Sequence, residues 1–91
     1  MPPDADVVWL HATGLVSLVS AQPTPDWYGI PLPTVEELTG TLIAFVSRLG
    51  TVQAARGDMV VQEHDELLFA LDGSDPVPLR NILTAAPKLE D

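Results

Sequence analysis

Imidazole and carboxylate side chains, which could hold a metal ion or transfer protons, occur together in Glu63-His64-Asp65-Glu66. Both groups are ordinary ligands of zinc and manganese. Successive side chains of a strand point to opposite faces, however, so adjacent residues do not converge on one ion. A further ligand would have to come from elsewhere, and His11 is the only other histidine. We therefore interpret this segment as a solvated hairpin turn and expect no metal and no cofactor.

The remaining reactive residue types also lack the spacing that catalysis requires. Asp72-Gly73-Ser74-Asp75 has too few oxygen ligands for a calcium loop and lacks the later glutamate, so it indicates a turn. Cysteine is absent, and the serines stand outside a nucleophile elbow. A glycine-rich phosphate loop with its lysine is missing as well. We therefore predict a protein that is not an enzyme.

The acidic residues suggest binding by charge. The chain has 4 Lys+Arg against 13 Asp+Glu and a formal net charge of −9, so nucleic acids and anionic membranes would repel it. Several carboxylates fall close together in the second half of the sequence: Asp58, Glu63, Asp65, Glu66, Asp72 and Asp75. Such an edge can steer a basic partner protein or imitate the phosphates of a nucleic acid. The alternative is a solvating rim that keeps sheet edges from aggregating.

A proline-rich segment, residues 22–33, provides candidate aromatic anchors. It holds four of the nine prolines around Trp27 and Tyr28. Proline fixes φ and removes hydrogen-bond donors, which predicts a stiff loop. Stiff loops lose little entropy when they dock, so Trp27 and Tyr28 are our candidate partner-binding aromatics. The alternative is that Trp27 and Ile30 fold inward to cover the end of the core.

The same segment carries a family resemblance. Pro25-Asp26-Trp27-Tyr28-Gly29, followed by Leu38-Thr39-Gly40, resembles the Pro-x-Tyr-Tyr-Gly to Leu-Thr-Gly segment of the barstar family, small acidic inhibitors of ribonucleases. The intervening Asn-Leu-Asp-Ala-Leu-Trp-Asp pattern of that family is absent, Ile30–Glu37 takes its place, and the spacing differs. The resemblance implies that the junction between the loop and the helix is negatively charged, through Asp26, Glu36 and Glu37.

The element expected to position these residues is a helix over Thr34–Gly50. Thr34 and Glu37 have the spacing of a capping box, and Gly50 is the residue type that ends helices in the left-handed conformation. One apolar face recurs at helical spacing, through Val35, Leu38, Leu42, Phe45, Val46 and Leu49. Gly40 and Thr41 weaken its middle. We expect this helix to be the centre of the fold.

The other segments read mainly as strands. Residues 7–10 and 15–20 suggest two strands and a turn, although helical spacing of Val8, Ala12, Leu15 and Val19 leaves one buried helix open. Strands are expected at 51–55, 59–62 and 67–71. A short helix is expected at Leu79–Ala86, preceded by Pro78, which is placed like a first helical residue. The sum is an α+β domain, a small antiparallel sheet packed against the central helix and the C-terminal helix.

The length and composition of the chain indicate its domain organisation and its location. Ninety-one residues make a single domain, 1–91, with polar tails at 1–6 and 88–91. Asp4 and Asp6 argue against a signal peptide, and the apolar runs are too short for a membrane span, which suggests a cytoplasmic or virion protein. Hydrophobic residues make up 46% and charged residues only 19%, so apolar surface is left for an interface.

Two functions follow from these features. The first is a non-catalytic acidic protein-binding module, such as an inhibitor, immunity protein, antitoxin or anti-defence protein, that occludes a basic site on a partner protein. The second is a structural or accessory subunit of a larger assembly, for example a phage virion protein, that uses its apolar surplus for self-association into a homo-oligomer.

Overall fold

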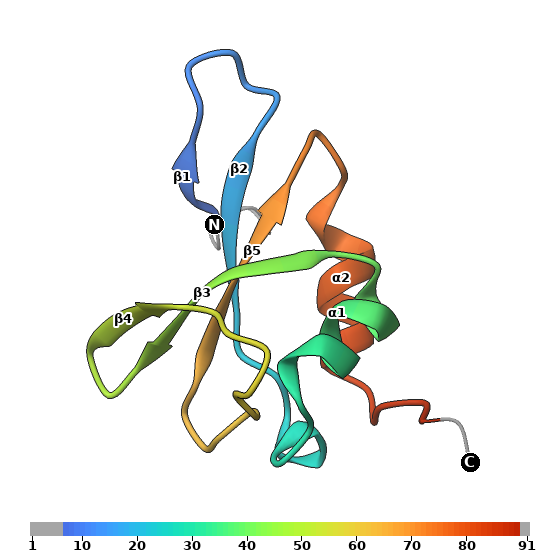
Figure 1. The fold of residues 1–91 in the computed structure, drawn as a ribbon. Helices are drawn as coiled ribbons and strands as arrows, with labels where there is room; N and C mark the ends of the chain where they lie inside the picture. Colours follow the sequence, from blue (N-terminus) through green and yellow to red (C-terminus); the bar gives the residue numbers. More distant parts are fainter. Residues whose placement is uncertain (1–6, 90–91) are drawn as a thin grey trace.

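The computed structural model describes residues 7–89 and shows one antiparallel sheet with two helices beside it (Figure 1). The strand order is β1-β2-β5-β3-β4, so the last strand of the sequence, β5, lies in the middle. Each pair of neighbours is antiparallel. The strands are β1 (Val7–Leu10), β2 (Ser17–Ala21), β3 (Leu42–Arg48), β4 (Thr51–Ala54) and β5 (Glu66–Leu71).

Both helices lie on the same side of this sheet. The helices are α1 (Leu32–Thr39) and α2 (Pro76–Leu83), and the short 3₁₀ turn η2 (Pro25–Trp27) precedes α1. Their apolar residues pack on β2, β3 and β5 in one hydrophobic core, while β1 and β4 form the two edges of the sheet (Figure 1). The protein is therefore built of two layers, one of helices and one of strands.

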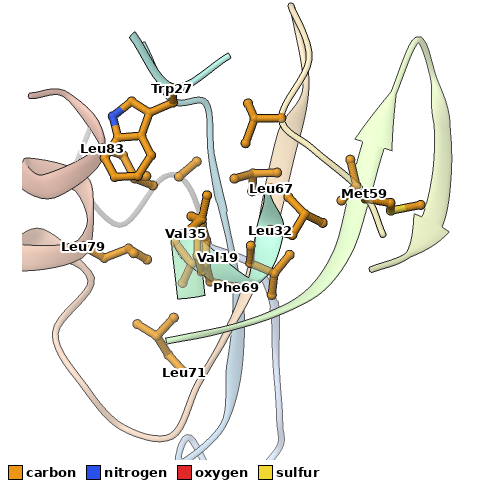
Figure 2. Packing of buried hydrophobic residues seen from close by; sticks show 14 residues of the cluster. Val19, Trp27, Leu32, Val35, Met59, Leu67, Phe69, Leu71, Leu79 and Leu83 are labelled. Carbon is orange, nitrogen blue, oxygen red and sulfur yellow. The ribbon is translucent and has the colours of Figure 1, made fainter. Parts of the chain in front are cut away.

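The core lies between these layers. Phe69 and Leu67 of the central strand are fully buried, and Trp27 closes one end of the core above Leu83 of α2 (Figure 2). Strand alternation explains which β5 residues take part, because Leu67, Phe69 and Leu71 share one face. The buried hydrophobic set is Val19, Ala21, Trp27, Leu32, Val35, Ile43, Val46, Met59, Val61, Leu67, Phe69, Leu71, Leu79 and Leu83.

The predicted central helix is much shorter than its sequence signals suggested. The helix ends at Thr39, because Gly40 adopts the left-handed conformation, with φ 66°, and its N–H donates to Glu36 O. Residues 42–48 then form β3, where Ile43 and Val46 reach the core from a strand. Thr34 does not cap the helix, since Pro31 occupies the cap position without a side-chain hydrogen bond.

The fold class is confirmed as α+β, with an antiparallel sheet and a short C-terminal helix. The N-terminal segment forms two strands and not one helix. Residues 59–62 do not form a full strand; Val60 makes a single bridge to Pro31. The C-terminal helix begins earlier than predicted, at Pro76, because Asp75 accepts a hydrogen bond from Val77 N and caps it. The tail residues 1–6 and 90–91 lie outside the described range.

Each helix has only eight residues. Within residues 7–89, no helix has the length and apolar character that crossing a bilayer requires.

Candidate protein-binding surface

Within residues 7–89, no helix lies over one face of the sheet, and the side chains on this face are mainly apolar. On β5 the side chains alternate, so Leu68 and Ala70 lie opposite to the core residues Leu67 and Phe69. Across the sheet, Phe45 pairs with Leu68, and both Leu18 and Leu42 pair with Ala70. These pairs place apolar side chains of β2, β3 and β5 side by side on the uncovered face.

A β-bulge in β3 helps to build this face. The pairing register shifts between Ile43 and Phe45, so that Leu42 and Phe45 lie on the same side although they are three residues apart. The same shift places Ile43 and Val46 in the core. The face extends to the two edges through Trp9, which pairs with Leu18, and Val52, which pairs with Ser47. We call this set the outer face: Trp9, Leu18, Leu42, Phe45, Val52, Leu68 and Ala70.

The exposure of the outer face is large for so small a protein. Leu42 is 68% exposed, Val52 60%, Trp9 47% and Phe45 37%. Isolated exposed apolar side chains are normal on protein surfaces, whereas a contiguous apolar patch is typical of a binding site. An antiparallel sheet with one solvent-facing side would ordinarily carry polar residues there. The outer face is therefore the best candidate for a functional surface among the described residues.

Carboxylates stand at both ends of the central strand on this face. At the start of β5, Glu66 pairs with Ser47 and accepts a hydrogen bond of 2.7 Å from Ser20 Oγ. Just after its end, Asp72 lines a hollow of about 310 Å³ together with Leu42 and Ala70. Both acids are exposed, so the apolar strip of β5 runs between two negative charges.

Trp27, predicted as an aromatic anchor, lies in the core instead. Its side chain is fully buried, and its Nε1–H donates to Ala85 O at 2.8 Å, so a partner cannot reach it in this structure (Figure 2). The alternative that Trp27 folds inward is the one observed. Tyr28, the next residue, remains 36% exposed. The segment that resembles the barstar family thus forms η2 and α1 on the covered side of the sheet.

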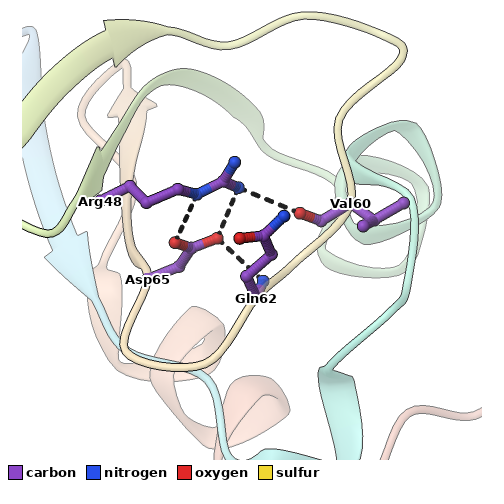
Figure 3. A network of polar contacts seen from close by, with 4 residues as sticks. All are labelled: Arg48, Val60, Gln62 and Asp65. Carbon is purple, nitrogen blue, oxygen red and sulfur yellow. Dashed lines mark hydrogen bonds and ion pairs between the residues drawn. The ribbon is translucent and has the colours of Figure 1, made fainter.

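Asp65, predicted as part of an acidic edge, is buried in an ion pair. Its two carboxylate oxygens accept hydrogen bonds from Arg48 Nε at 2.9 Å and Arg48 Nη2 at 2.8 Å (Figure 3). Gln62 N also donates to Asp65, and Arg48 donates to Val60 O. The hydrogen bond with Asp65, more than its charge, raises the pKa of Arg48. This pair fastens the loop before β5 to β3 and is not available for steering.

The other predicted acids have separate local roles. Asp58 lies 3.5 Å from Arg56 Nε, and Glu63 lies 3.6 Å from His64 Nε2, both at exposed positions. Asp75 caps α2. Of the six acids, Glu66 and Asp72 are the two that flank the outer face. Between Val7 and Leu89, no three His, Asp or Glu side chains gather as metal ligands would.

Sequence reasoning missed the outer face because it assigned its residues to a helix. Leu42 and Phe45 were counted on one helical stripe with Val46. The missed signal lay in the apolar run from Leu42 to Val46, which is short, follows a glycine and contains β-branched residues. Trp9 was interpreted only as part of a strand.

Part of the chain is similar to a known protein. No protein-family model matches the chain. Over 65 residues the chain is 34% identical to the Trk system potassium uptake protein TrkA of Streptomyces coelicolor. The matching region covers 71% of this chain but 29% of that protein, so the chain spans less than a third of the length of the curated relative that it matches.

Proposed function

We propose that this chain is a non-catalytic protein-binding module of a potassium uptake system. The observation that carries the proposal is the 34% identity over 65 residues to a Trk system potassium uptake protein. The matched part is a fraction of that relative, which suits a module that acts on or with another protein. A cytoplasmic location belongs to the same proposal.

The shape of the molecule supports binding as its mode of action. An apolar sheet face with Leu42 at 68% and Val52 at 60% exposure leaves surface that a partner protein would cover. The net charge of −9 favours a partner with a basic surface. By covering such a surface, the module would act as an inhibitor, as the sequence suggested. The activity that it inhibits would be ion uptake.

The proposal is tested in the cells that produce the protein. The coding sequence for residues 7–89 is deleted, and the rate of rubidium or potassium uptake is measured in potassium-limited medium. We expect the uptake rate to change in the deletion strain and to return to its original value when the intact sequence is restored. An unchanged uptake rate, at matched growth rate and membrane potential, would refute the proposed function.

A further inference from the structure

Among the described strands, charge on the outer face lies at the two ends of the central strand, at Glu66 and Asp72, and this arrangement selects the kind of partner. Glu66 and Asp72 are six positions apart in the chain, and at roughly 3.3 Å per residue their Cα atoms stand about 20 Å apart. Between them on this face lie Leu68 and Ala70, and beside these lie Leu42 and Phe45. A partner must therefore match an apolar strip that is bounded by two negative charges.

A second copy of this chain does not meet that requirement. Its outer face has no basic residue among Trp9, Leu18, Leu42, Phe45, Val52, Leu68 and Ala70. Two sheets packed face to face with their strands aligned are about 10 Å apart, and in a dimer they are related by a two-fold axis that lies between them. If the axis runs along the strands, Glu66 faces Glu66. If it runs across them, Glu66 faces Asp72. Either arrangement brings carboxylates together at both ends of the central strand. The dimer would also have a formal net charge of −18, twice the −9 of one chain.

We propose that the outer face binds a different protein, through a surface whose apolar side chains lie between two basic side chains about 20 Å apart. One basic group would approach Glu66 beside Ser20, and the other would enter the hollow beside Asp72. The apolar side chains between them would cover Phe45 and Leu42. This inference rests on the proposed role as a protein-binding module and adds the surface and the chemistry of the partner.

Photocrosslinking in the producing cells tests this assignment. The photoreactive residue p-benzoylphenylalanine replaces Phe45 on the outer face, and in a control variant it replaces Glu37, which is exposed on α1. Crosslinked products are sized, and the attached peptide is identified by mass spectrometry. The same experiment is repeated in the background of the double substitution Glu66→Lys and Asp72→Lys, with each variant's thermal unfolding recorded to confirm that it is folded.

The inference predicts a product at position 45, absent at position 37, in which the attached peptide comes from another protein and has apolar residues flanked by Lys or Arg. The double charge reversal should remove most of that product. A crosslink to a second copy of this chain would overturn the inference, as would a product that persists after charge reversal or the absence of any product at position 45. A partner outside potassium uptake would refute the proposed function and leave this surface assignment standing.

Discussion

Arg48 on β3 holds the buried carboxylate of Asp65 by two hydrogen bonds, of 2.9 Å from Nε and 2.8 Å from Nη2. The side chain of Asp65 is fully buried, while that of Arg48 is 20% exposed. The pair joins the end of β3 to the loop that leads into β5, because Asp65 also accepts a hydrogen bond from Gln62 N. It therefore sets the position of the central strand, on which the outer face depends.

Replacing Asp65 with Ala should destabilise the protein by about 3 kcal/mol, because it removes the two hydrogen bonds and the charge that Asp65 provides to Arg48. The partial exposure of Arg48 places the effect at the low end for such pairs. Urea denaturation measures the free energy of unfolding. Asp58→Ala is the matched control, since Asp58 and its partner Arg56 are exposed, and it should change this free energy by no more than about 0.5 kcal/mol. Equal effects of the two substitutions would contradict the structural role of Asp65.

The raised pKa of Arg48 predicts the pH range in which this pair contributes. A group whose folded-state pKa is raised adds stability below its unfolded pKa, and this stability is lost as pH rises through the folded pKa. For Arg48 that loss falls in strongly alkaline solution. The destabilisation caused by Arg48→Gln, relative to the original chain, should therefore be the same at pH 7 and pH 9. A difference that shrinks between these two values would contradict the assigned ionisation.

Trp27 and Trp9 should respond in opposite ways to substitution. Trp27→Ala removes a fully buried indole and should cost about 3–5 kcal/mol, enough to abolish a cooperative thermal transition in a domain of this size. Trp9→Ala removes a side chain that is 47% exposed and should leave the transition in place. Thermal unfolding followed by circular dichroism compares the two variants. A well-folded Trp27→Ala variant would show that the indole is not part of the core.

Neighbouring residues of β3 test which face of the sheet is open. Leu42→Glu places a carboxylate on the outer face and should leave the melting temperature almost unchanged in the isolated protein. Ile43→Glu places the same group in the core, where Ile43 is only 6% exposed, and should unfold the protein. Differential scanning calorimetry distinguishes the two results. If Leu42→Glu destabilises as much as Ile43→Glu, the outer face is covered within the folded chain.

Gly40 should be the residue that divides helix α1 from strand β3. Its φ of 66° is unfavourable for residues with a Cβ, and the space around it is open, so Gly40→Ala should cost about 1 kcal/mol through the backbone alone. Gly57 has equally open surroundings and no positive φ, which makes Gly57→Ala a matched control with little effect. Urea denaturation of both variants checks this difference. No loss of stability in Gly40→Ala would show that the chain passes this point in another conformation.

The sequence predicted the class of the fold better than its central element. The short apolar strand at 67–71 and the turn around Gly73 were recognised from local patterns. The segment 42–49 carried two compatible patterns, because Leu42, Phe45, Val46 and Leu49 also fit a helical stripe. Pairing with β5 on one side and β4 on the other decides between them, and such long-range pairing is not encoded in local spacing.

The candidate surface was harder to predict because the burial of a side chain depends on contacts with residues that are distant in the sequence. The local sequence could not show that Trp27 donates to Ala85 O, 58 residues away, or that Asp65 pairs with Arg48. Both were chosen for their residue type, and both are held in the interior. The outer face became recognisable only when the register placed Phe45 beside Leu68 and both helices on the opposite side.

We propose that the outer face carries the function in potassium uptake. The most direct test of this proposal is the uptake rate in cells in which the deleted sequence is replaced by Phe45→Glu or by Val77→Glu, a control on α2, which packs on the other side of the sheet. Both proteins must be present at equal levels and folded. We predict that Val77→Glu restores the original uptake rate and that Phe45→Glu leaves the cells like the deletion strain. Full restoration by Phe45→Glu would contradict the claim.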